Sequence, residues 1–219
     1  MSDVLPAVLI AASYFIGSIP FSYLVARVAS GTDIREAGSR NVGATNVART
    51  AGESAGVVAL LLDIAKGYAA VALARWFVLR ADWPFAAVSS SPLHSREMWI
   101  ALGGLTAVLA HMFPVWLGFH GGKGVATATG VFLALDPIVV AAAAIVFIIV
   151  ILSTRFVSLA SILSAASVPV FFRFLAHDAP FWRIAISIVI AIAVITKHHS
   201  NISRLTQGTE RRMGERKAE

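Results

Sequence analysis

The chain has 219 residues, of which 58% are hydrophobic and 14% are charged, and its mean hydropathy is +0.78. A soluble domain is about 45–50% apolar and about 25% charged, so this composition leaves too little polar surface to cover a water-soluble core and fits lipid instead. The net charge of +6 matches the Lys and Arg bias of cytoplasmic loops rather than nucleic-acid binding, and the absence of cysteine excludes disulfides and thiolate chemistry.

The first half of the chain predicts three membrane-spanning helices, because each crossing needs about 20 mainly apolar residues. The expected spans are residues 4–28, 55–79 and 98–119. A polar segment at 30–53, rich in Gly, Asn, Thr and Arg, separates the first two spans, and a loop at 80–97, to which we assign no chemistry, separates the next two. Asp63 and Lys66 lie three residues apart inside the second span, a spacing that favours a structural ion pair over a proton relay.

The second half predicts four more spans after a glycine-rich break at 121–124. They are residues 125–135, 138–152, 157–175 and 181–196. The two spans that flank Asp136-Pro137 are short, so a re-entrant segment there would change the count. We expect one integral membrane domain over residues 1–219, with the basic tail from about residue 206 as its candidate flexible segment.

The basic residues of the loops predict the orientation of the chain in the membrane. The loops at 27–53, 120–124 and 153–155 and the tail from 197 together hold twelve Lys and Arg residues, against four in the loops on the opposite side. Cytoplasmic loops carry the excess of basic residues. The prediction is therefore an all-α protein of seven transmembrane helices with short loops, an outside N-terminus and a cytoplasmic C-terminus.

The segment 38–49 carries an unusual density of hydrogen-bonding residues on the predicted cytoplasmic side. Its candidate phosphate-binding residues are Gly38, Ser39, Asn41, Gly43, Thr45, Asn46 and Arg49. Glycines let backbone amides turn toward an anion, and the planar guanidinium of Arg49 suits phosphate oxygens. The alternative is an ordinary polar turn between spans.

A second glycine-rich segment, 119–127, opens a predicted helix on the same side. Gly121, Gly122 and Lys123 precede the helix, where free amides and the positive end of the helix dipole favour anions. The spacing differs from a nucleotide P-loop, because Leu117 replaces the first glycine and Gly124 stands where Ser or Thr would bind magnesium. The alternative is a flexible hinge beside a snorkelling lysine.

The tail adds a third polar group of residues. If the last helix continues, His198, Asn201 and Leu205 share one face, and His198 could exchange protons near neutral pH. The alternative is an interfacial polar cap. The chain has no His-Glu-x-x-His, no His-x4-Asp and no Gly-x-Ser-x-Gly pattern, and we expect no metal site.

Three runs together resemble the cytoplasmic motifs of the PlsY family, the bacterial acyl-phosphate:glycerol-3-phosphate acyltransferases. They are GSRNVGATNVART at 38–50, GFHGGKGVAT at 118–127, and HHSNISRL at 198–205 with Gly208 and Glu210. The resemblance implies seven spans in the bacterial inner membrane, with the active site facing the cytoplasm. It also implies acyl transfer from acyl phosphate to the 1-hydroxyl of glycerol 3-phosphate, giving lysophosphatidic acid and phosphate in phospholipid biosynthesis, without a cofactor. A functional link to the enzyme that produces acyl phosphate follows from that donor.

The residues suggest a hypothesis for how the reaction runs. Arg49 and Lys123 would hold glycerol 3-phosphate, and the residues that assist them are Thr45, Asn46 and Ser158. The residues over which acyl phosphate would lie are Ser39, Gly43 and the amides of Gly121 and Gly122. His198 and Asn201 would position the attacking hydroxyl, and the matching motifs add Gly38, Asn41, Arg204 and Glu210 to the expected substrate site. Ser39 belongs to the expected catalytic set, although no base beside it supports a covalent role. The alternative function is a transporter for a phosphorylated solute, which would use the same anion sites.

Overall fold

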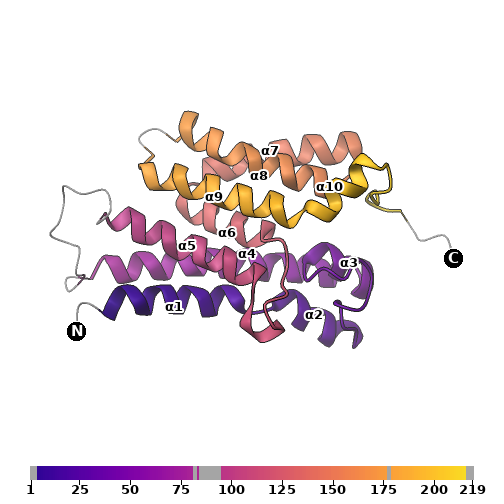
Figure 1. Ribbon diagram of the computed structural model, residues 1–219, viewed down its shortest axis with the longest axis horizontal. Helices are drawn as coiled ribbons and strands as arrows, with labels where there is room; N and C mark the ends of the chain where they lie inside the picture. The colour runs from indigo at the N-terminus through magenta and orange to yellow at the C-terminus, as the bar shows by residue number, and fades with distance from the viewer. Residues whose placement is uncertain (1–3, 81–82, 84–94, 177–178, 216–219) are drawn as a thin grey trace. The chain divides into compact units, whose positions relative to one another are not determined.

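The computed structural model describes residues 4–80, 83, 95–176 and 179–215, and every regular element in these ranges is a helix (Figure 1). The all-α prediction is therefore confirmed for the described part of the chain. Most of the predicted loop at 80–97 and the last four residues of the tail lie outside the described residues. The chain divides into two compact units, Met1–Leu135 and Asp136–Glu219.

The first unit contains six α-helices and one short 3₁₀ helix among its described residues. They are α1 (Leu5–Ser18), α2 (Phe21–Ser30), α3 (Ala44–Ala51), α4 (Glu53–Val78), α5 (Arg96–Met112), η3 (Val115–Leu117) and α6 (Val125–Leu135). Helices α1, α4 and α5 pack against one another, α6 packs on α4 and α5, and α2 and α3 lie together at one end of the unit (Figure 1).

Glycine makes the contact between α4 and α6 close. A Cβ on Gly67 would overlap the carbonyl oxygen of Thr127, and one on Gly130 would overlap the carbonyl oxygen of Ile64. Small residues of this kind let helix backbones approach in membranes, where no hydrophobic force drives helices together. The two glycines therefore place the start of α6, which follows the second glycine-rich loop, directly against α4.

The second unit contains the remaining four helices of the described chain. They are α7 (Pro137–Thr154), α8 (Val157–Phe174), α9 (Phe181–Lys197) and α10 (His199–Thr206). Asp136 caps α7, because its Oδ1 accepts hydrogen bonds from the amides of Ile138 and Val139 at 2.9 and 3.2 Å. Helix α8 packs against both α7 and α9, and α10 leaves α9 at a bend of 58°.

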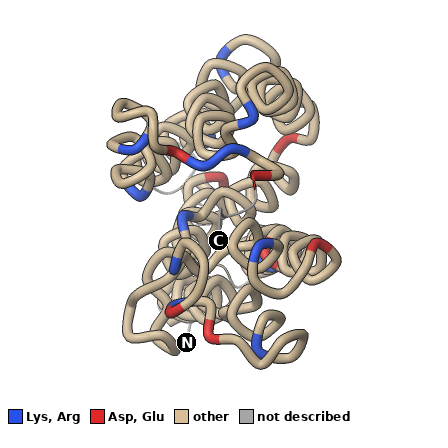
Figure 2. Tube along the Cα trace, turned by 90° about the vertical axis from the view of Figure 1, so that its right-hand side faces the viewer, with Lys and Arg blue, Asp and Glu red and all other residues tan. Residues whose placement is uncertain are grey.

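Charged residues are sparse along the trace, as the few coloured segments of Figure 2 show. Among the described residues, five stretches are long and apolar enough to cross a membrane, namely Leu5–Ser30, Glu53–Val78, Arg96–Leu117, Pro137–Thr154 and Val157–Phe174. Counting α9 and α10 together as one bent crossing gives a sixth. Helix α6 has 11 residues and so is about 16 Å long, well short of a hydrocarbon core of about 30 Å. This short helix is the predicted fourth span, and a total of seven crossings requires that it cross the membrane.

The first predicted span departs from a continuous helix. Helix α1 ends at Ser18 and α2 begins at Phe21, with Ile19 and Pro20 between them. Proline has no amide hydrogen to donate and its ring crowds the preceding turn, so the helix is interrupted there. At this break the carbonyl oxygen of Ile19 accepts the Phe21 amide at 3.0 Å and also a side-chain donor, Lys66 Nζ, at 2.8 Å.

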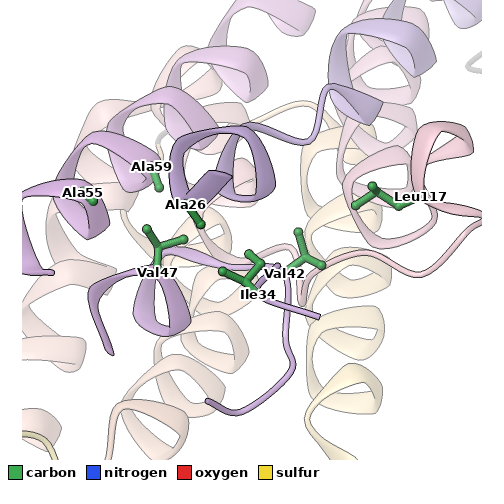
Figure 3. Close-up of a cluster of buried hydrophobic side chains, with 7 residues drawn as sticks. All are labelled: Ala26, Ile34, Val42, Val47, Ala55, Ala59 and Leu117. Carbon is green, nitrogen blue, oxygen red and sulfur yellow. The ribbon is translucent and has the colours of Figure 1, made fainter. Parts of the chain in front are cut away.

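An apolar cluster supports the polar loop between α2 and α3. Its buried members are Ala26, Ile34, Val42, Val47, Ala55, Ala59 and Leu117 (Figure 3). Ile34 and Val42 belong to the loop itself and point into the cluster, so the loop has an apolar underside and a polar outer side. This underside fixes the loop against α2, α3 and α4.

Candidate active site

Asn46 organises the first loop from the inside. Its side chain is only 1% exposed, and its Oδ1 accepts a hydrogen bond from the amide of Ser39 at 2.8 Å. Its Nδ2 donates to the carbonyl oxygens of Ile34, Ala37 and Asn41 at 3.0, 3.1 and 3.1 Å. The amide that we expected to contact substrate is therefore engaged in shaping the loop, because a buried polar group of this kind needs partners within the chain.

Gly38 is required by this arrangement. Its φ of +61° lies in the left-handed region, and a Cβ there would overlap Oδ1 of Asn46. The next residue, Ser39, is exposed at the turn of the loop, with its amide tied to Asn46. The Ser39 side chain is therefore exposed, while the Ser39 backbone is fixed by its hydrogen bond to the buried Asn46 side chain.

The short helix α3 presents two of the predicted residues on one exposed face. Thr45 and Arg49 are four residues apart and both exposed, whereas Asn46 and Val47 face inward and are buried. The guanidinium of Arg49 and the hydroxyl of Thr45 can therefore address the same small anion. The sequence named Thr45 and Arg49 as candidate phosphate-binding residues but predicted no helix here, so their shared face comes from the structure alone.

The second loop does not offer the two amides that we expected to bind acyl phosphate. The amide of Gly121 donates to the carbonyl oxygen of Met112 at 3.2 Å, and that of Gly122 donates to the carbonyl oxygen of His111 at 3.2 Å. A Cβ on Gly121 would overlap the His111 carbonyl oxygen as well. The two glycines are thus there for close approach to the end of α5, and the prediction that their amides cradle phosphate is corrected.

The two loops touch each other. A Cβ on Gly122 would overlap the carbonyl oxygen of Val42, which belongs to the first loop. Lys123 follows Gly122 directly, is partly exposed, and precedes the first turn of α6. The structure therefore brings the segments that carry Arg49 and Lys123 side by side in the first unit.

A polar cluster is buried beneath this junction. Lys66 Nζ lies 2.8 Å from Asp63 Oδ1, 2.8 Å from the carbonyl oxygen of Ile19 and 3.0 Å from His111 Nδ1. Ser22 donates to Asp63 Oδ2 at 2.8 Å. The predicted ion pair is confirmed, and it is enlarged by Ser22 and His111, which sequence reasoning missed. A lone histidine inside an apolar span was the available signal for His111, because an ionisable group there needs a partner.

Glu210 gathers three other predicted residues in the second unit. Its Oε1 accepts hydrogen bonds from Ser158 Oγ at 2.7 Å and Asn201 Nδ2 at 2.6 Å, and its Oε2 accepts one from Arg204 Nε at 2.7 Å. Burial raises the pKa of Glu210, but the bonds from Asn201, Ser158 and Arg204 outweigh it and leave that pKa below its ordinary value. Both carboxylate oxygens accept hydrogen bonds from the chain's own donors, so Glu210 orders the site residues around it, and its expected contact with substrate stays a prediction.

His198 stands at the bend between α9 and α10 and is 3% exposed. Its Nδ1 lies 2.8 Å from the carbonyl oxygen of Val194. A carbonyl oxygen only accepts hydrogen bonds, so Nδ1 carries a proton and, in the neutral ring, Nε2 is left as the acceptor. This tautomer suits a role in receiving a hydrogen bond from a hydroxyl group.

The described part of the tail folds back onto the turn between α7 and α8. Arg155 Nη2 donates to the carbonyl oxygen of Met213 at 2.7 Å, and the amide of Met213 donates to the carbonyl oxygen of Arg155 at 2.7 Å. The guanidinium of Arg212 lies 5.4 Å from the centre of the Phe156 ring. The tail that we expected to be flexible from residue 206 is therefore held through this contact, and residues 216–219 lie outside the described chain.

The predicted site residues form one group in each unit. The first unit holds Gly38, Ser39, Asn41, Gly43, Thr45, Asn46, Arg49, Gly121, Gly122 and Lys123. The second holds Ser158, His198, Asn201, Arg204 and Glu210.

Known proteins are similar in sequence to this chain along nearly its whole length. The profile of the family described as glycerol-3-phosphate acyltransferase matches residues 7–208. A glycerol-3-phosphate acyltransferase from Geobacter sulfurreducens is 44% identical over 205 residues, which cover 94% of this chain and 96% of that protein. One from Thermosynechococcus vestitus is 44% identical over 202 residues, covering 92% of each chain.

Solved structures share the fold. The crystal structure of PlsY, an integral membrane glycerol 3-phosphate acyltransferase, in its glycerol 3-phosphate form matches with a TM-score of 0.80 and 37% identity, covering 95% of this chain and 96% of that one. The lysophosphatidic acid form of PlsY matches with a TM-score of 0.78 and 35% identity, covering 95% of each chain.

Proposed function

This chain belongs to the glycerol-3-phosphate acyltransferase family, and we therefore propose that it transfers a fatty acyl group from acyl phosphate to the 1-hydroxyl of glycerol 3-phosphate. The hydroxyl oxygen forms the new ester bond to the acyl carbon, and the carbon–oxygen bond to phosphate breaks. The products are lysophosphatidic acid and inorganic phosphate, and the departing phosphate accepts the hydroxyl proton. The relatives give no support to the alternative of a solute transporter.

The observation that carries the proposal is the contact between the first and second loops where Gly122 meets Val42, since the first loop leads into α3 with Arg49 and Lys123 follows Gly122. Both substrates carry phosphate, so cationic side chains from these two adjoining segments can neutralise charge while the reactants are aligned. We assign Arg49 and Lys123, with Thr45, to the phosphate of glycerol 3-phosphate. An acyl phosphate is already activated, and orientation with charge neutralisation is the main contribution required of the protein.

The remaining residues of the first unit divide into contacting and shaping roles. Ser39 and Gly43 are assigned to the acyl phosphate, with the Ser39 hydroxyl as a hydrogen-bond donor rather than a nucleophile. The residues that shape the two loops are Gly38, Asn41, Asn46, Gly121 and Gly122. This division follows from the inward hydrogen bonds of Asn46 and the occupied amides of the two later glycines.

In the second unit we assign His198 and Asn201 to the attacking hydroxyl. The Nδ1 proton of His198 is fixed by Val194, so Nε2 can accept from that hydroxyl and orient it. Glu210 holds Asn201, Ser158 and Arg204 in place, and Ser158 and Arg204 complete the substrate-binding group.

We further propose seven crossings of the bacterial inner membrane, an outside N-terminus and an active site facing the cytoplasm. The asymmetry of Lys and Arg in the loops supports this orientation. We also propose that residues 1–219 form one integral membrane domain. A cytoplasmic site that consumes acyl phosphate implies a functional link to the enzyme that makes this donor.

One assay tests the activity and the donor together. Purified protein is incubated with radiolabelled glycerol 3-phosphate and palmitoyl phosphate, and lysophosphatidate is separated by thin-layer chromatography. We expect product with palmitoyl phosphate and none when palmitoyl-CoA replaces it. Product with the thioester alone would overturn the donor, and no product with either donor would contradict the activity.

A further inference from the structure

The buried cluster in the first unit has no part in the chemistry proposed so far. Asp63, Lys66 and His111 are only 1%, 4% and 7% exposed. They line a cavity of about 10 Å³ together with Ser22 and Pro114. A buried ion pair stabilises a protein no more, and often less, than apolar side chains of the same volume would, and ionisable groups in a membrane span usually mark a function. We therefore expect the cluster to have a function in addition to any contribution to the stability of the fold.

The hydrogen bonds of Lys66 fix the state of the His111 ring. An ammonium group only donates, so the 3.0 Å contact from Lys66 Nζ makes His111 Nδ1 an acceptor. The neutral ring then carries its proton on Nε2. Lys66 is itself held by Asp63 at 2.8 Å and by the carbonyl oxygen of Ile19 at 2.8 Å. The ring, which α5 carries, is thus anchored on one edge by two other elements, α4 and the break between α1 and α2.

The opposite edge of the ring meets the junction of the two loops. A Cβ on Gly122 would overlap both His111 Nε2 and the carbonyl oxygen of Val42. The backbone carbonyl of His111 also accepts the Gly122 amide at 3.2 Å. Gly122 precedes Lys123, and Val42 lies in the loop that leads to Arg49. His111 therefore sits where a small movement would change the separation of the two cationic residues.

We propose that His111, oriented by the Asp63–Lys66 ion pair, is a positioning residue that sets the spacing between the first and second loops. The inference rests on the proposed function for the meaning of that spacing, since the two loops are assigned to phosphate. The ring acts through Gly122 and Val42 and touches neither substrate. Loss of the ring would leave both side chains, Arg49 and Lys123, present, but the distance between them would no longer be fixed.

Three substitutions separate positioning from simple loss of stability. His111→Gln keeps an amide close to the place of Nε2, beside Gly122. His111→Asn keeps an acceptor for Lys66 but is too short to reach Gly122, and His111→Ala removes both contacts. We expect the KM for glycerol 3-phosphate to rise at least about tenfold in His111→Ala and His111→Asn, since misplaced cations weaken hydrogen bonds to a charged group, and one such bond contributes about tenfold or more to binding. His111→Gln should recover most of this loss, and kcat at saturating substrate should fall less than KM rises.

A distance measurement tests the inference without any activity. The chain has no cysteine, so nitroxide labels can be attached at Arg40→Cys and Phe119→Cys, both exposed positions in the two loops. Pulsed electron paramagnetic resonance should give one narrow distance distribution in the otherwise unchanged protein and in His111→Gln. It should broaden in His111→Asn and His111→Ala. Ser13→Ala, which removes a buried hydroxyl of α1 away from both loops, is the matched control and should leave the distribution narrow.

The outcomes are distinct. A distribution in His111→Asn and His111→Ala as narrow as in the control overturns the positioning role, whatever the kinetics show. Should His111→Ala fail to fold, the comparison of His111→Asn with His111→Gln decides the question alone. A broadened distribution in a protein that forms no lysophosphatidate leaves the positioning role standing and removes the proposed function instead.

Discussion

Gly38 is under two separate constraints, one from its own backbone and one from its neighbour. Its φ is +61°, and Oδ1 of Asn46 occupies the space where a Cβ would stand. Gly31 offers a comparison within the same polar segment, because its φ is +68° but nothing lies within 4 Å of its Cβ position. A comparison of alanine substitutions at Gly31 and Gly38 therefore distinguishes the cost of the left-handed backbone, present at both positions, from the cost of steric overlap, present only at Gly38.

Gly38→Ala should therefore destabilise the protein more than Gly31→Ala does. We expect about 1–2 kcal/mol from the left-handed backbone in each variant. Gly38→Ala should lose more, because Asn46 must move and weaken its four hydrogen bonds in the loop. Thermal unfolding of both variants in the same detergent measures this. Equal losses in Tm would show that the Asn46 contact contributes nothing.

At single residues, the sequence named polar candidates but did not show how they are arranged. Thr45 and Arg49 were both named, but the helix α3 that sets them on one face was not predicted, because it is short and polar. The pattern also did not reveal that the amides of Gly121 and Gly122 are taken by the carbonyl oxygens of Met112 and His111, because it did not show that the chain turns back over the end of α5. A glycine in a sequence indicates that another group can come close to the backbone, and only the folded structure shows which group does.

Among the elements, the tail is attached through a titrating group, Glu210. The pKa of Glu210 lies below its ordinary value of 4.5 in the folded protein. A lowered pKa means that Glu210 stabilises the folded tail above about pH 4.5 and loses this contribution as the pH falls through the native pKa. The tail should therefore loosen in acid.

A nitroxide at Thr209→Cys reports this loosening, since Thr209 is next to Glu210 and the chain has no other cysteine. We expect low label mobility at neutral pH and rising mobility as the pH falls below 4.5. Glu210→Gln should give high mobility at every pH, because the amide does not titrate in this range and, being neutral, cannot form the ion pair with Arg204. Mobility that stays pH-dependent in Glu210→Gln would assign the transition to another group.

The helices themselves could largely be predicted from hydropathy, with errors at their breaks. The polar segments and Asp136-Pro137 marked most helix ends correctly, since Asp136 caps α7 and Pro137 begins it. The break before α2 went unpredicted although Pro20 was visible, because the apolar run continues through it. The bend at His198 could not be foreseen either, since residues on both sides form helix.

At the scale of the whole molecule, helix α6 decides the topology. With 11 residues it crosses a bilayer only where neighbouring helices or local thinning shorten the path. The seven-span proposal requires that its two ends face opposite sides of the membrane. Single cysteines at Phe119 and Pro137, exposed positions before and after α6, can report this.

We expect a membrane-impermeant maleimide added to intact cells to label Pro137→Cys and to spare Phe119→Cys until the cells are opened. A third cysteine at Arg35, in the segment proposed to be cytoplasmic, should behave like Phe119→Cys. Equal protection of the cysteines at Phe119 and Pro137 in intact cells would make α6 a re-entrant segment and reduce the number of crossings.

The account as a whole depends on Arg49 and Lys123 acting together on one phosphate. Steady-state kinetics of Arg49→Ala and Lys123→Ala, with glycerol 3-phosphate varied at saturating palmitoyl phosphate, tests this most directly. Arg35→Ala, which removes an exposed arginine paired with Asp33 at 2.7 Å, is the control and should keep its KM. Hydrogen bonds to charged groups contribute about 1.5–3 kcal/mol, so each site variant should raise the KM for glycerol 3-phosphate about ten- to a hundredfold. An unchanged KM in both variants would contradict the account.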